Sequence, residues 1–193
     1  MSQHRRLLPI FALLALLALT VGVSACGYEH DSNHVDEGEP LELGELHYNI
    51  TFSRYLNPND PEDEAYLVGQ PEAPKGESYF GVFFEIQNES EHALSLPSEL
   101  KITDTDGQEY EVVESESIFA LPLGEELEGE EQMPILDSPA QLGPIEGSLA
   151  IFLLPEEASE NRPLTLHIPG GENEEEEHAG DEHGGGGEVV LDL

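Results

Sequence analysis

Apolar and polar residues alternate along several short segments of the chain. Residues 46–52 alternate strictly, with Phe52 as the last member of the apolar face of an extended segment. Residues 79–88 combine a similar alternation with aromatic side chains on both faces, which indicates a central strand. Residues 147–154 are apolar on both faces and stop at Pro155, which favours a covered strand over a long helix. The pattern therefore predicts a chain built mainly from strands.

The two strongest of these strands supply the predicted core. Successive side chains of a strand point to opposite faces, so alternate residues of each segment point inward. Tyr79 and Phe83 are expected to lie partly on the opposite face. The predicted core residues are Phe80, Val82, Phe84, Ile86, Leu149, Ile151 and Leu153.

Turn residues separate the remaining predicted strands. Residues 101–103 and 110–113 flank an Asp-Thr-Asp-Gly sequence in which Gly107 takes a positive φ at little cost, so they predict a hairpin. Short strands are also expected at residues 133–136, 163–168 and 188–193. The last of these is expected to pair with the one before it, the alternative being a frayed apolar tail.

Seven or eight short strands separated by turn signals predict an all-β fold, an antiparallel β-sandwich, over residues 41–193. Residues 26–40 are polar, acidic and without periodicity, which indicates a disordered tether. Residues 170–187 contain four consecutive Glu and four consecutive Gly, which predicts a disordered acidic insert. Residues 57–76 are rich in Pro, Gly, Asn and Asp, so we expect an irregular connection without a helix. One helical turn is expected within residues 156–161.

The N-terminus has the composition of an export signal. Two arginines precede an apolar run of 17 residues at 7–23, which is short of the roughly 20 needed to cross a bilayer. The run ends in Val-Ser-Ala-Cys-Gly, which resembles the bacterial lipobox. The resemblance implies diacylglyceryl attachment at Cys26, removal of residues 1–25, and a protein held at the outer face of the cell membrane. The alternatives are an ordinary secretory peptide cut after Ala25 and an uncleaved N-terminal helix.

The chain is strongly acidic. Its 193 residues include 42 Asp and Glu against 6 Lys and Arg, a formal net charge of −36. A field of this sign repels polyanions, so no nucleic-acid partner is expected. Abundant carboxylate with little Lys also suits a high-salt habitat, which concerns the surroundings and not the activity. No nucleophile elbow, zincin helix, phosphate loop or dinucleotide fingerprint is present, and among so many acids no carboxylate pair stands out, so we expect no enzymatic activity.

Histidine is the one residue type that clusters. His30 and His34 lie in the acidic tether, His178 and His183 lie in the acidic insert, and His167 faces outward from the strand before that insert. Neutral imidazole beside carboxylate suits Zn, Ni or Cu(II). These five residues are the candidate ligands of a weak metal site. The alternative is a solvated acidic linker that contains histidines by chance, and no other cofactor is expected.

Two motifs resemble a known family. An aromatic strand ends in Asn88-Glu89-Ser90, and a later hairpin carries Asp104-Thr105-Asp106-Gly107 followed by Tyr110. Residues 44–168 resemble the immunoglobulin-like domains of Gram-positive, actinobacterial-type secreted lipoproteins of unknown function, which are similar in fold to a mycobacterial secreted immunogenic protein. The resemblance implies an immunoglobulin-like β-sandwich on the cell exterior, with no catalytic residues.

The sequence thus favours a lipid-anchored, extracellular immunoglobulin-like module with a binding or structural role in the bacterial cell envelope. The expected partners are the membrane, through the lipid, and an unknown envelope or extracellular protein. The alternative is an envelope protein that binds a divalent metal through its His- and acid-rich segments. A binding module should expose an apolar surface, whereas a metal-binding protein should bring histidines together.

Overall fold

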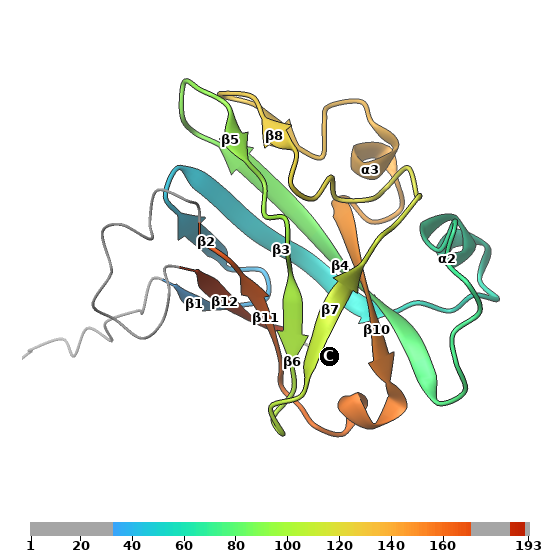
Figure 1. Ribbon diagram of the computed structural model, residues 1–193. Helices are drawn as coiled ribbons and strands as arrows, with labels where there is room; N and C mark the ends of the chain where they lie inside the picture. Colours follow the sequence, from blue (N-terminus) through green and yellow to red (C-terminus); the bar gives the residue numbers. More distant parts are fainter. Residues whose placement is uncertain (1–32, 171–185, 192–193) are drawn as a thin grey trace, which may run out of the picture. The chain divides into compact units, whose positions relative to one another are not determined.

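The computed structural model describes residues 33–170 and 186–191 of the chain (Figure 1). No helix in these two ranges is long and apolar enough to cross a bilayer. The strands are β1 (His34–Asp36), β2 (Pro40–Leu43), β3 (Leu46–Tyr55), β4 (Glu77–Asn88), β5 (Leu94–Ser95), β6 (Lys101–Thr103), β7 (Glu109–Val113), β8 (Glu126–Leu127), β9 (Gln132–Met133), β10 (Ser148–Pro155), β11 (Leu164–Ile168) and β12 (Gly187–Leu191). The helical segments are α2 (Pro61–Tyr66), α3 (Pro139–Leu142) and the 3-10 turn η2 (Glu156–Ser159).

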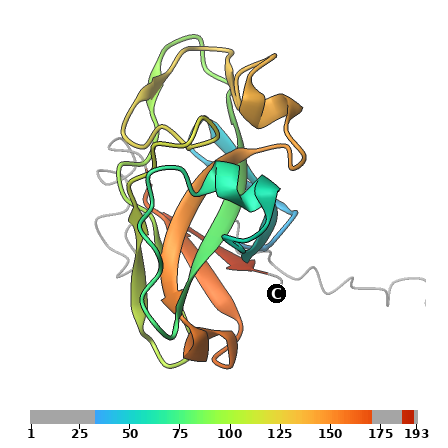
Figure 2. The ribbon, with the colours of Figure 1, turned by 90° about the vertical axis from the view of Figure 1, so that its right-hand side faces the viewer.

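The strands form two packed layers. One layer has the order β1-β12-β11-β6-β7 and the other the order β10-β4-β3-β2, with β9 beside β4 and a short β5-β8 pair apart from both (Figures 1 and 2). The layers are continuous at one side, where Val112 and Val113 of β7 pair with β10. The fold is therefore the predicted all-β sandwich. It has more strands than the predicted seven or eight, because six of its strands are only two to four residues long.

The core between the layers is formed as the alternation predicts. Phe80, Val82, Phe84 and Ile86 of β4 are at most 1% exposed and face Ile102, Leu166 and other apolar residues of the opposite layer. These four predicted core residues are confirmed.

A second, smaller core lies on the other side of β4 and β10. Phe83, Leu149 and Ile151 are at most 1% exposed there and pack with Tyr66 of α2. The Tyr66 ring meets the Phe83 ring edge to face, with centroids 5.3 Å apart. Leu153 also packs here but is only partly buried. The predicted burial of Leu149 and Ile151 is confirmed, and Phe83 is buried more completely than its expected position implied.

A β-bulge changes the register of β3. Ile50 pairs with Phe84 and Phe52 pairs with Phe83, so Thr51 is an extra residue on its strand. Beyond the bulge the two faces exchange, because one added residue turns every later side chain over. Phe52 is 43% exposed, and Ser53 is buried and hydrogen-bonded to the Glu37 carboxylate. The prediction that Phe52 faces the core is wrong.

The connection between β3 and β4 contains helix α2, so the prediction of a helix-free connection is wrong. Asp60 caps the helix by accepting a hydrogen bond from Glu62 N–H (2.9 Å), and Pro61 occupies its first turn. Asp63, which is 1% exposed, forms a two-pronged ion pair with Arg54 of β3. These contacts hold α2 over the second core.

The C-terminal strand forms as predicted. β12 pairs antiparallel with β11, from Leu164 opposite Leu191 to Ile168 opposite Gly187, so the frayed-tail alternative is wrong. On its other side β12 pairs in parallel with β1, which makes the sandwich mixed rather than purely antiparallel. The folded domain therefore begins before residue 41, because β1 comes from the predicted tether.

The predicted insert joins two adjacent points of the fold. A Cβ built on Gly186 would lie 3.2 Å from Gly170 N, so the ends of the segment are side by side. Most of the insert (171–185), the first part of the tether (26–32) and the predicted signal (1–25) lie outside the described residues.

Candidate functional site

The first motif of the family resemblance is a structural clip. Asn88 is fully buried at the end of β4, and its side-chain amide donates hydrogen bonds to the carbonyls of His92 (2.9 Å), Leu127 (2.9 Å) and Glu128 (3.1 Å). Its side-chain oxygen accepts from both N–H and O–H of Ser90. All the polar atoms of this side chain are engaged within the fold, so the motif fixes a chain corner.

The second motif closes the β6-β7 hairpin. The Asp104 carboxylate accepts hydrogen bonds from the N–H groups of Asp106 (3.0 Å) and Gln108 (2.9 Å) and from the Tyr110 hydroxyl (2.9 Å). Burial raises the pKa of Asp104, but these hydrogen bonds outweigh it and leave the pKa below its ordinary value. Burial, with the hydrogen bond to Asp104, raises the pKa of Tyr110 to about 12. The turn is held in one conformation and presents no free carboxylate at Asp104.

Two of the five predicted metal ligands meet on the outer face of the sheet. His34 of β1 and His167 of β11 are the cross-strand neighbours of Glu188 in β12. His34 Nδ1 lies 3.2 Å from one oxygen of the Glu188 carboxylate, and His167 Nδ1 lies 3.4 Å from the other. The second ring nitrogen of His167 is hydrogen-bonded to the Thr103 hydroxyl at 2.8 Å. We name these residues, His34, His167 and Glu188, the histidine row.

Burial and charge act on His167 in opposite directions. Burial lowers the pKa of its imidazole, the Glu188 and Glu109 carboxylates raise it, and Lys101 lowers it further. The pKa stays below its ordinary value, so burial outweighs the attraction of the two carboxylates. His167 is therefore held mainly as neutral imidazole near pH 7, which is the form that binds metals.

The other predicted ligands, His30, His178 and His183, and the predicted lipidation site Cys26 lie outside the described residues. Within residues 33–170 and 186–191, no three His, Cys, Asp or Glu side chains are arranged to hold a metal ion. Glu188 separates the two imidazoles of the histidine row. The pairing of His167 with Glu188 follows from the predicted hairpin, whereas His34 joins the row through a parallel pairing that the sequence did not reveal.

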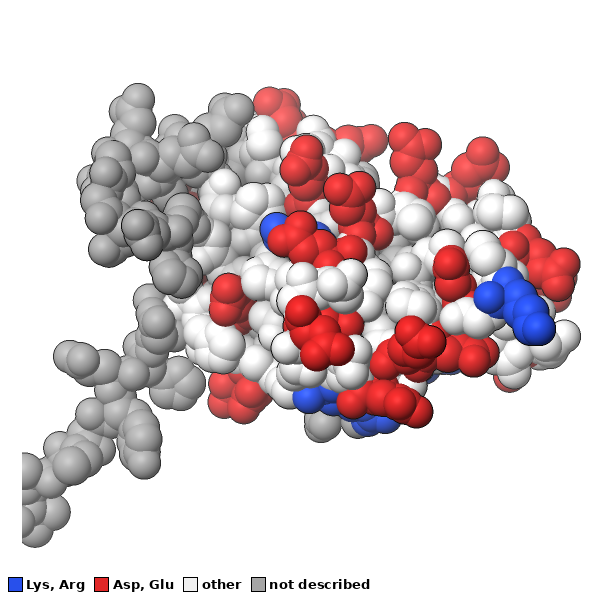
Figure 3. Space-filling view, turned by 60° about the horizontal axis from the view of Figure 1, so that its bottom comes forward, with Lys and Arg blue, Asp and Glu red and all other residues white. Residues whose placement is uncertain are grey.

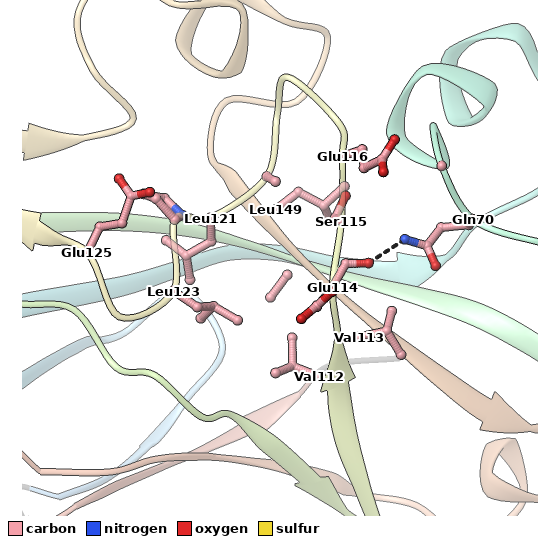
Figure 4. A pocket seen from close by; sticks show the side chains of 14 residues that line it. Gln70, Val112, Val113, Glu114, Ser115, Glu116, Leu121, Leu123, Glu125 and Leu149 are labelled. Carbon is pink, nitrogen blue, oxygen red and sulfur yellow. Dashed lines mark hydrogen bonds between the residues drawn. The ribbon is translucent and has the colours of Figure 1, made fainter.

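An open groove lies where β7 leaves β10. Beyond Val113 the chain turns away, and Phe119 and Leu121 take its place by hydrogen bonding with Leu149 of β10 (2.7 and 2.8 Å). The space left between the two segments measures about 560 Å³, and Leu149 and Ala150 of β10 are among the residues that line it. We call this space the β7 groove (Figure 4).

Apolar and polar groups both line the β7 groove, and its rim is acidic. Its apolar side chains are Val112, Val113, Leu121 and Leu123, with Glu116 and Glu125 at the rim and Glu114 projecting inward from it. Figure 4 shows the Glu114 side chain directed toward the middle of the groove, with Glu116 and Glu125 at two of its ends. Gln70 Nε2 donates a 2.6 Å hydrogen bond to the Glu114 carbonyl and so joins the segment after α2 to this wall.

Exposed apolar side chains gather at the end of α3 and in the loops around it. Ile118, Ile135, Leu136 and Leu142 are 72%, 59%, 63% and 70% exposed. Phe119 joins the Ile118 loop to the end of α3, because a Cβ on Gly143 would lie 3.0 Å from its ring. We call these four residues the α3 loop surface. Elsewhere in the described chain, only Phe52 and Val68 are large apolar residues with comparable exposure.

Comparison with known proteins gives no family for this chain. No family model and no curated protein matches it. Among solved structures it is similar to the YjhA protein of Bacillus subtilis (14% identity, 82% of this chain and 99% of that one, TM-score 0.49). It is also similar to an uncharacterised β-sandwich protein of Clostridium difficile (16% identity, 83% of this chain and 94% of that one, TM-score 0.45). A candidate lipoprotein of Bacillus subtilis, YcdA, matches over 81% of this chain and 39% of its own length (12% identity, TM-score 0.47). No functional residue is carried over from any of them.

Proposed function

We propose that this chain is a non-enzymatic binding module, held at the outer face of the cell membrane by lipid on Cys26, that binds an envelope or extracellular protein through the α3 loop surface. The same proposal includes a relationship between this chain and the immunoglobulin-like domains of actinobacterial-type secreted lipoproteins. A binding role is favoured over catalysis because the side chains of Asn88 and Asp104, in the two motifs rich in polar residues, form hydrogen bonds to other groups of the domain.

The observation that carries the proposal is the exposure of the α3 loop surface. Both faces of the central strand β4 are covered. Of the large apolar residues exposed in the described ranges, only Phe52 lies on a strand, so the sheets offer little apolar area to a partner. Ile118 and Leu142 nevertheless keep about 70% of their surface in water, within loops that contact each other. Clustered exposed apolar side chains are typical of protein interaction sites. Loops on a rigid sandwich are also where binding residues are usually carried.

Crosslinking on intact cells tests this role. The full chain, with a C-terminal affinity tag, is compared with a variant in which Ile118, Ile135, Leu136 and Leu142 are changed to Ser. The control variant carries Phe52→Ser and Val68→Ser, which removes exposed apolar residues outside the surface. We expect one or more proteins to be captured with the wild type and the control and to be lost with the loop variant. Equal capture by all three would contradict the proposed site.

Divalent-metal binding remains a second candidate function, favoured by the convergence of His34 and His167 on Glu188. Calorimetry with Zn and Ni on the full chain tests it. The His34→Gln/His167→Gln variant is compared with His47→Gln/His92→Gln, whose histidines also lie beside glutamates. Loss of binding heat only in the first variant would support the metal role. Equal heats from both variants would show that the histidine row does not contribute.

A further inference from the structure

We propose that the β7 groove is a binding site for an extended peptide segment of a partner protein that carries Lys or Arg next to an aliphatic residue. This site is separate from the α3 loop surface and would bind its ligand whether or not that surface has a partner. Three features of the groove determine the ligand class: its volume, its apolar lining and its acidic rim.

The volume of the groove limits the size of its occupant. At about 560 Å³ it is within the range of roughly 300–1,000 Å³ typical of ligand pockets. A space of this size holds a few side chains with their backbone and not the surface of a folded domain. A short stretch of extended chain fits these dimensions.

The lining of the groove requires apolar contact. Its apolar lining residues are Val112, Val113, Leu121, Leu123, Leu149 and Ala150. An aliphatic side chain entering the groove would remove apolar surface from water on both partners, which favours binding. A ligand with charged groups but no apolar side chain would leave this lining exposed to water.

The rim sets the charge of the ligand. None of Glu114, Glu116 and Glu125 forms an ion pair with a residue in the described ranges, and no Lys or Arg lines the groove. Figure 3 shows the wider surface with carboxylates spread over the visible face and few basic side chains. Three carboxylates beside these apolar side chains attract a cation and orient it at the rim, with its neighbouring apolar residue inside.

The same charge argues against the other occupants. A second copy of this chain, with its own net charge of −36, would be repelled as a whole. Nucleic acid and anionic lipid are repelled for the same reason. A Lys- or Arg-bearing segment of a different protein is the macromolecular ligand that matches both the lining and the rim.

Peptide binding to the full-length chain in non-ionic detergent tests the assignment. The probe is a fluorescent Leu-Lys-Val-Lys-Leu pentapeptide, and its affinity is measured by fluorescence anisotropy at 0.15 M salt. The groove variant is Glu114→Gln/Glu116→Gln/Glu125→Gln. The matched control is Glu42→Gln/Glu91→Gln/Glu157→Gln, which removes the same charge from exposed sites elsewhere on the domain. Circular dichroism checks that both variants keep the wild-type fold.

We expect the groove variant to bind the peptide about tenfold more weakly than the wild type, and the control variant to bind within about twofold of it. A Ser-Lys-Ser-Lys-Ser peptide should bind more weakly than the probe, because it leaves the apolar lining unfilled. No binding to the wild type at millimolar peptide, or equal weakening in both variants, would overturn the proposal. Full competition by spermidine at the concentration of the probe would assign the groove to small organic cations and overturn the peptide assignment.

Discussion

Phe83 and Phe52 are opposite one another on β4 and β3, yet the structure gives them very different roles. Phe83 is fully buried under α2, whereas Phe52 is 43% exposed because of the bulge at Thr51. The strand alternation alone predicts the reverse ranking, with Phe52 inward and Phe83 partly outward. Truncating each of them to Ala therefore tests the bulge and the second core together.

The expected costs follow from burial. Phe83→Ala deletes a fully buried ring, which costs about 3–5 kcal/mol, and removes the edge-to-face contact with Tyr66, worth a further ~1 kcal/mol. Phe52→Ala removes a ring that is nearly half in water and should cost about 1 kcal/mol. With a urea m-value of about 2 kcal/mol/M, the unfolding midpoint should fall by about 2–3 M for Phe83→Ala and about 0.5 M for Phe52→Ala.

The assay is urea unfolding of the full chain followed by far-ultraviolet circular dichroism. Phe84→Ala, in the core between the layers, provides a reference expected to lose about as much stability as Phe83→Ala, since both rings are fully buried. Equal midpoints for the Phe83 and Phe52 variants, or a larger loss for Phe52→Ala, would refute the register that places the bulge at Thr51.

Three further changes test single contacts by the same urea assay. Asn88→Ala removes the donors to three carbonyls and should cost about 2–3 kcal/mol, while exposed Gln87→Ala should cost less than about 0.5 kcal/mol; similar losses would contradict the clip. Asp63→Asn weakens the ion pair with partly exposed Arg54 and should cost about 1–3 kcal/mol, so an unchanged midpoint would show that α2 does not depend on it. Burial lowers the pKa of His167, so below about pH 6.5 the unfolded chain takes up the proton more readily than the folded one. The free energy of unfolding of the wild type, relative to that of His167→Gln, should therefore decrease as the pH is lowered from 8 to 5. A difference between the two proteins that does not change with pH would contradict this.

The main strands could be predicted because the order of apolar and polar residues along each one shows which of its faces are buried. β4, β10, β11 and the β6-β7 hairpin form where the alternation and the turn residues place them. β12 could also be predicted, because the apolar, β-branched segment after the glycine-rich stretch has the composition of a strand. The bulge could not, because Thr51 lies inside an unbroken alternation and only pairing with β4 shows the extra residue.

The missed helix and the missed strand have different causes. α2 has a readable signal, since Asp60 followed by Pro61 is a common helix start, but the many Pro, Gly and Asn residues around it favour an irregular connection. β1 carried almost none, because three residues within a polar segment become a strand only by pairing with β12. Tertiary contacts decide such short elements.

The candidate sites depend even more on tertiary structure. His34 and His167 are far apart in sequence and meet only because β1 and β11 both pair with β12. The β7 groove is made by segments around residues 112–116, 120–125 and 149–150, none of which carries a signature of its own. The exposure of Ile118 and Leu142 is likewise invisible in a pattern where apolar residues are expected to be buried.

Anchoring through Cys26 is the claim that places this protein at the cell surface, and metabolic labelling with an alkyne fatty acid tests it most directly. Wild-type chain and a Cys26→Ala variant are expressed in a bacterial host and examined by electrophoresis after labelling. Lipidation at Cys26 predicts a labelled wild type that has lost residues 1–25, and an unlabelled variant that remains as the larger precursor. An unlabelled wild type whose N-terminus is not Cys26 would contradict it.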